Sequence, residues 1–120
     1  LLPENVDELL VAPQSVTMHP ALGLTDAQVY VDNTSGTKPL TWEAFPVESW
    51  ISLDTTTGTT SDQVTVSVDT AGLAPGAYQG TIVFLTPDIP GGSSETVDVF
   101  FVIAPERAEF SVFLPVILKP

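Results

Sequence analysis

The chain has 120 residues, 43% of them hydrophobic, and its 15 acidic and 3 basic residues give a formal net charge of −12. This length suits one domain with its own core, and the apolar content exceeds that of disordered segments. The excess of acids argues against binding to nucleic acids or anionic membranes, because both require clustered Lys and Arg. The absence of cysteine excludes disulfides and leaves the redox compartment undetermined.

The first residues carry no targeting pattern. Leu1 is followed by acids, with no basic segment ahead of an apolar run, as a signal peptide would have. No apolar run reaches the length that spans a bilayer, so we expect no membrane insertion. We interpret residues 1–8 as a linker remnant within a larger exported protein whose signal peptide lies upstream. The surface, poor in Lys and rich in Thr, Ser, Gly and Pro, favours an extracellular or cell-surface location.

Alternation of apolar and polar residues predicts a series of β-strands. A first strand is expected within residues 9–18, where Pro13 favours an edge strand or a strand that switches sheets. The best helical candidate is a turn over residues 4–10, with override by the β-rich context as the alternative. Further strands are predicted over residues 25–33, 40–44, 50–53, 63–69, 78–85 and 96–103.

Turn-forming segments separate these strands, at residues 33–36, 55–60, 74–76 and 90–92. Short strands at this spacing predict an all-β fold. We expect an immunoglobulin-like or fibronectin III-like antiparallel β-sandwich of about seven strands over residues 9–104. An extended apolar C-terminal tail follows over residues 105–120.

The segment from Leu73 to Tyr78 is the most specific local signal. A Leu, a Pro-Gly turn and a Tyr that enters a strand form the pattern of a tyrosine corner, in which the hydroxyl bonds to the backbone a few residues upstream. We therefore interpret Leu73 and Tyr78 as structural, with ligand stacking by Tyr78 as the alternative.

Several segments together resemble a known family. They are Trp50-Ile51-Ser52-Leu53, Gly58-Thr59-Thr60, Val64 to Val68 and Gly72 to Ile82, preceded by Asn33 to Gly36 and Leu40-Thr41-Trp42. This sequence resembles the BACON-type immunoglobulin-like domains of bacterial exported and surface proteins, over about residues 9–104. The resemblance implies a spacer or accessory domain, and also a carbohydrate- or mucin-binding role to which no site is attached.

Catalytic groups are scarce. His19 is the only histidine and no Gly-x-Ser-x-Gly turn is present, so a serine-type triad is not expected. The acids show no spacing that selects a pair for glycoside hydrolysis. No His cluster or Asp-rich loop predicts a metal site, although a weak calcium site from loop acids stays open. We expect no enzyme activity, no catalytic residue, no metal and no cofactor.

Carbohydrate recognition would need exposed aromatic rings. Trp42 has the inward parity of its strand and is expected in the core. Trp50 begins a short strand after Pro46, and Tyr30 has the outward parity of its strand. Trp50 and Tyr30 are therefore the candidates for sugar stacking, although for Trp50 packing at the rim of the sandwich is the favoured interpretation and stacking is the alternative.

The last two predicted strands carry apolar residues on the parity expected to face water: Val83, Leu85, Phe100 and Val102. Such a patch marks an interaction surface, unless sheet twist places part of it in the core. The tail is also apolar at Phe110, Val112, Leu114, Val116 and Leu118. We expect the tail to cover this patch as an extra strand or extended segment, in its own molecule or in a dimer.

These observations predict a non-catalytic structural or protein-interaction module, an accessory domain or spacer of a larger exported protein. Its expected partner is a protein or a second copy of itself. The alternative is a carbohydrate-binding module that uses exposed aromatic residues to bind a glycan.

Overall fold

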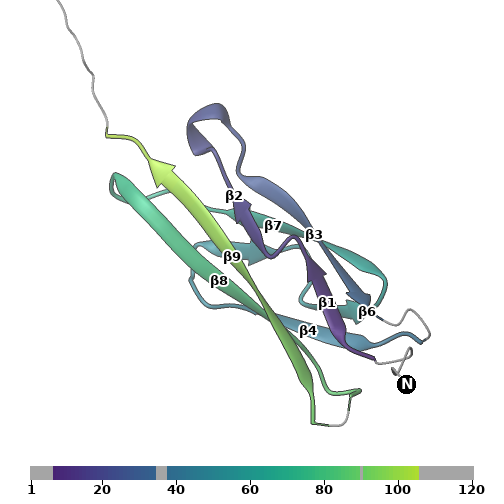
Figure 1. Cartoon of the computed structure of the whole chain (residues 1–120). Helices are drawn as coiled ribbons and strands as arrows, with labels where there is room; N and C mark the ends of the chain where they lie inside the picture. Colours follow the sequence, from purple (N-terminus) through teal and green to yellow (C-terminus); the bar gives the residue numbers. More distant parts are fainter. Residues whose placement is uncertain (1–6, 35–37, 90, 106–120) are drawn as a thin grey trace, which may run out of the picture.

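The computed structural model describes residues 7–34, 38–89 and 91–105. In this part of the chain the backbone forms nine β-strands and one 3₁₀ turn, shown in Figure 1. In chain order the elements are β1 (Leu9–Ala12), β2 (Ser15–Thr17), η1 (Pro20–Leu22), β3 (Asp26–Asn33), β4 (Thr41–Pro46), β5 (Ile51–Leu53), β6 (Thr57–Thr59), β7 (Asp62–Val68), β8 (Gly76–Thr86) and β9 (Ser93–Ile103).

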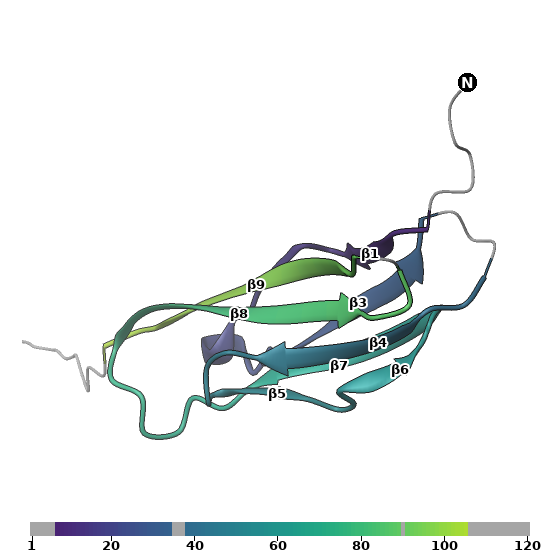
Figure 2. The same ribbon diagram turned by 90° about the horizontal axis from the view of Figure 1, so that it is seen from below.

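The strands form two sheets that pack as a β-sandwich (Figure 2). One sheet has the order β1-β3-β7-β5 and the other β2-β9-β8-β4-β6. The first predicted strand is divided at Pro13: β1 pairs with β3 in one sheet, and β2 pairs in parallel with β9 in the other. Both pieces are edge strands, which confirms the interpretation of Pro13, because proline cannot donate to a central ladder.

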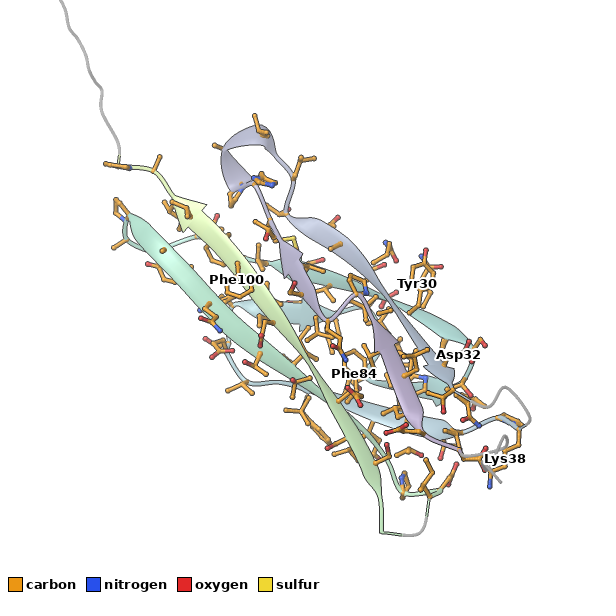
Figure 3. All side chains as sticks on the ribbon, in the orientation of Figure 1. Tyr30, Asp32, Lys38, Phe84 and Phe100 are labelled. Atoms are coloured by element: carbon orange, nitrogen blue, oxygen red, sulfur yellow. The ribbon has the colours of Figure 1, made fainter. Side chains whose placement is uncertain are left out.

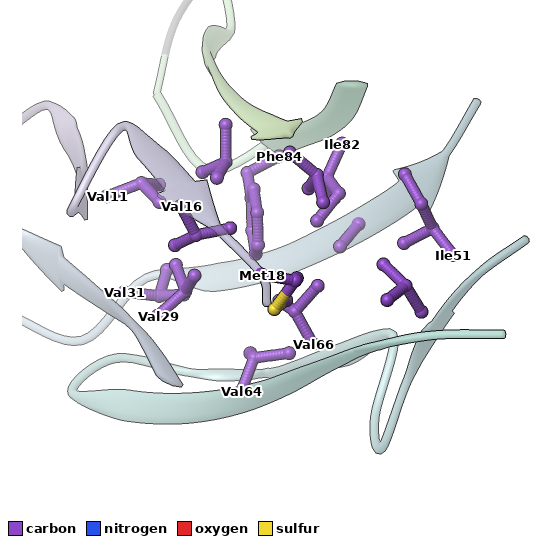
Figure 4. Close-up of a cluster of buried hydrophobic side chains, with 14 of the residues drawn as sticks. Val11, Val16, Met18, Val29, Val31, Ile51, Val64, Val66, Ile82 and Phe84 are labelled. Carbon is purple, nitrogen blue, oxygen red and sulfur yellow. The ribbon is translucent and has the colours of Figure 1, made fainter. Parts of the chain in front are cut away.

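The core lies between the sheets and follows the predicted alternation. Val29 and Val31 of β3 and Val64 and Val66 of β7 are completely buried, and so is Trp42 of β4 on the opposite sheet. Figure 4 shows these valines gathered with Met18, Ile82 and Phe84. Burying side chains of this size stabilises a fold by about 1.5–3 kcal/mol each. The apolar residues of the alternating pattern therefore supply most of the driving force for folding.

Two elements differ from the sequence-based expectation. The segment predicted as a Thr-rich turn contains β6, which pairs Gly58 with Trp42. A Cβ atom at Gly58 would collide with the Asp62 carboxylate and lie 2.9 Å from the Trp42 ring, so this glycine serves close packing. The helical turn predicted over residues 4–10 is wrong where the structure describes it, because Leu9 and Leu10 belong to β1.

Among the described residues, no helix has the length and apolar character needed to cross a bilayer.

Candidate functional site

Tyr78 has the geometry predicted for a tyrosine corner. Its hydroxyl donates to the carbonyl oxygen of Ala74 at 2.6 Å. Its ring stacks on that of Phe101, with centroids 5.0 Å apart and planes 13° apart. Leu73 is partly buried against the same core. The hydroxyl and one face of Tyr78 therefore hold the β7–β8 connection against the sandwich, which favours the structural interpretation.

Replacing Tyr78 with Phe should lower the free energy of unfolding by about 1 kcal/mol, the usual net value of one hydrogen bond. Tyr30→Phe is the matched control, because the Tyr30 side chain is 53% exposed on the surface, and it should change stability by less than about 0.5 kcal/mol. Urea unfolding of both variants measures the difference. Equal stability of the two variants would remove the structural role of the hydroxyl.

The two candidate sugar-binding rings do not share a surface. Trp50 points inward, edge-on to Phe101 at 4.9 Å and to Tyr78 at 6.2 Å. A Cβ atom at Gly80 would lie 2.6 Å from the Trp50 ring, so the ring rests directly on the β8 backbone. Tyr30 lies on the outer face of the four-stranded sheet, opposite Gln63 (Figure 3). The structure therefore does not bring the two rings together into one platform.

The acids mainly hold segments of backbone in place. The Glu48 carboxylate accepts from the N–H of Thr81 at 2.8 Å. The Asp88 carboxylate accepts from both the N–H and the hydroxyl of Thr41, at 2.7 and 2.8 Å. The backbone hydrogen bond from Thr41, and then the hydroxyl bond, lower the pKa of Asp88 below its ordinary value. These carboxylates therefore act as charged hydrogen-bond acceptors for neighbouring strands and loops.

His19 lies in a tight turn. Its N–H donates to the Leu24 carbonyl oxygen at 2.8 Å, and its own carbonyl oxygen accepts from Leu24 N–H at 3.0 Å. The side chain is exposed. Across residues 7–34, 38–89 and 91–105, no group of three or more His, Cys, Asp or Glu side chains is placed to hold a metal ion.

Strand register divides the predicted apolar patch into two. On the outer face, β8 and β9 pair Thr81 with Asp98, and the Thr81 hydroxyl lies 3.5 Å from the Asp98 carboxylate. Val83 and Leu85 lie on one side of this polar row, where Val83 is beside the exposed Phe45 of β4. Phe100 and Val102 lie on the other side. The four residues therefore do not form one continuous surface.

The half of the patch that contains Phe100 and Val102 is hollowed. A cavity of about 300 Å³ is lined by residues 17–22, Ala77, Tyr78 and residues 100–102. We call this hollow the η1 groove. Turn η1 contacts β9 and lies beside its end in Figure 1. The lining is largely apolar, which suits an apolar side chain more than a charged ligand.

Two large apolar side chains at the groove are open to water. Leu22 of η1 is 74% exposed and Val102 of β9 is 62% exposed. Sequence reasoning identified Phe100 and Val102 by strand parity but missed Leu22, because only the folded chain brings η1 against β9. The predicted tail residues Phe110, Val112, Leu114, Val116 and Leu118 lie outside the described residues.

A family model described as the viral BACON domain matches residues 8–89. The chain belongs to this family. The match confirms the BACON-type resemblance, although its description names viral proteins where the sequence suggested bacterial ones. BACON domains are accessory modules, in agreement with the general class of function predicted from the sequence. No curated protein matches the chain.

Solved structures share the sandwich fold at low sequence identity. A Bacteroides ovatus GH5 xyloglucanase matches at 17% identity and a TM-score of 0.60, over 80% of this chain and 19% of that one. The Pseudomonas aeruginosa CupB2 chaperone matches at 14% identity and a TM-score of 0.64, over 82% of this chain and 58% of the chaperone. The CooA pilin subunit of enterotoxigenic Escherichia coli matches at 15% identity and a TM-score of 0.53, over 82% of this chain and 99% of the pilin. This chain therefore spans about a fifth of the xyloglucanase and over half of the chaperone, and the likeness confirms the β-sandwich.

Proposed function

We propose that this BACON domain is a non-catalytic accessory module of a larger exported protein, and that it makes protein contacts through the η1 groove. The observation that carries the proposal is the exposure of Leu22 and Val102 around an apolar hollow of about 300 Å³. Exposed apolar surface of this kind is costly in water unless it binds something. A polypeptide segment with apolar side chains is the ligand that this lining fits best.

Known proteins of similar architecture support a module that works within larger assemblies. The xyloglucanase is a much longer chain of which this fold accounts for a small part. Another similar structure is the CsuC–CsuE chaperone–tip adhesion subunit pre-assembly complex of Acinetobacter baumannii, which is a complex of two proteins. These cases favour an extracellular or periplasmic setting and a protein partner, which a second copy of the chain could also provide.

Carbohydrate binding is the second candidate, and Tyr30 favours it. The exposed ring lies beside Gln63, whose side-chain amide donates to the Gln28 side-chain oxygen at 2.7 Å. An aromatic face next to amides is a combination that sugars bind. A glycan array with native protein and Tyr30→Ala tests this candidate: binding lost in the variant would support it, and absence of binding by the native protein would remove it.

The groove is tested by a charge placed on its wall. In a chain ending at Pro105, which keeps all nine strands, Val102→Glu should reduce binding of an uncharged environment-sensitive dye several-fold, since burying a charge in an apolar hollow is unfavourable. Val47→Glu is the matched control, because Val47 is 63% exposed and lies outside the groove. Circular dichroism checks that both variants remain folded.

A further inference from the structure

We propose that residues 110–118 dock in the η1 groove of their own molecule, as an extended apolar segment that covers Val102 and Leu22. This inference rests on the proposed function, because it names the polypeptide that the groove binds. In this arrangement the tail covers only one end of the outer face, and Val83 and Leu85 are not covered by it.

The groove has the size and lining of a side-chain receptor. A cavity of roughly 150 Å³ lined by apolar groups is enough to hold a benzene ring, and the η1 groove measures about 300 Å³. It can therefore hold one aromatic ring together with an aliphatic neighbour. The partly buried ring of Phe100 contributes to its lining, and the exposed Leu22 and Val102 side chains would gain contacts from an occupant.

Residues 110–118 match this receptor in composition. Seven of these nine residues are Phe, Val, Leu or Ile. β9 already pairs with β8 on one side and with β2 on the other, so an added strand beside Asp98 to Phe100 has no free edge. Docking through side chains, without ladder hydrogen bonds, is the arrangement that remains there. Pro115 is compatible with it, because a proline lacks the N–H that a ladder would need.

The connection is short and starts at the groove. Val102 lines the groove, β9 ends at Ile103, and six residues, 104–109, separate that strand from Phe110. Six extended residues reach about 20 Å, which allows the chain to reverse onto its own surface. A linker this short gives an effective concentration in the range of mM, so docking in the same molecule is favoured over docking in a second copy.

The other apolar half of the outer face is a poorer receptor for the same segment. Val83 pairs with Thr96, which lies six residues before Val102 along β9. At about 3.3 Å per residue the segment would have to travel roughly 20 Å further. It would also cross the polar row of Thr81 and Asp98.

Disulfide trapping in the full chain tests the inference, because the natural sequence has no cysteine. Leu22→Cys is combined with a cysteine at position 110, 112, 113, 114 or 116 in turn, so that an unknown register cannot hide a contact. Tyr30→Cys with the same partners is the control, since Tyr30 is also exposed but lies on the other sheet. Oxidation is followed by mass spectrometry and non-reducing size-exclusion chromatography.

At least one Leu22→Cys pair should form a monomeric disulfide tenfold or more faster than its Tyr30→Cys control. Equal rates for all pairs would overturn the inference, and so would disulfide-linked dimers as the main product, because the occupant would then be a second copy. If trapping fails while dye binding to the chain ending at Pro105 still depends on Val102, the groove receives another protein and the proposed function stands. If the dye result fails, the proposed function falls by itself.

Discussion

Trp42→Ala is expected to lower the free energy of unfolding by about 3–5 kcal/mol, the range for truncation of a large buried aromatic residue. Trp42 has no exposed surface, and its ring lies 5.8 Å from that of Phe84 on the neighbouring strand. Natural domains are stable by only about 5–15 kcal/mol, so this loss would leave a marginal fold. Thermal and urea unfolding measure the effect.

Trp42→Phe separates loss of volume from loss of the indole N–H. Nε1 of Trp42 is buried and has no hydrogen-bond partner among the described residues. Phenylalanine keeps an aromatic ring near Phe84 and removes this unpaired donor, which is costly to bury. We expect Trp42→Phe to cost less than half as much as Trp42→Ala. An alanine variant within about 1 kcal/mol of the native protein would contradict the position of Trp42 in the core.

Trp50→Ala is expected to cost about 3 kcal/mol, the lower end of the range for aromatic truncation, because Trp50 is only partly buried. The substitution removes the edge-on contacts with Phe101 and Tyr78 and leaves the space above Gly80 empty. Differential scanning calorimetry measures the loss as a lower Tm.

Tyr30→Ala is the control for Trp50→Ala, with an expected change of less than about 0.5 kcal/mol. The Trp50→Ala substitution also separates the two interpretations of Trp50. A Trp50→Ala protein that keeps native stability but loses binding to a glycan would show that the ring faces a ligand. A less stable protein with unchanged glycan behaviour would agree with the packing described above.

Much of the fold could be predicted because strand parity is encoded locally. Alternation placed Val64, Val66 and Val68 on one face, and all three are buried. Pro13 marked the change of sheet. The missed strand β6 shows where local signals fail: Gly58 has the appearance of a turn residue, but its lack of a side chain makes room for Trp42 across the pair.

The candidate site could be predicted only in part, because it depends on register and on long-range packing. Parity predicts that Val83, Leu85, Phe100 and Val102 share one face, but only the β8–β9 register shows that Thr81 and Asp98 separate them. Nothing near Leu22 in the sequence indicates that η1 lies against β9 and lines the same hollow. The position of Trp50 on Gly80 likewise depends on residues thirty positions apart.

The paired charge substitutions on the chain ending at Pro105 test the role of the η1 groove most directly. Val102 and Val47 are exposed to nearly the same extent, 62% and 63%, so the two variants differ mainly in where the charge lies. A several-fold loss of dye binding in Val102→Glu with none in Val47→Glu is the predicted result. Equal dye binding by both variants and the unsubstituted chain would contradict the assignment of this groove as a contact surface.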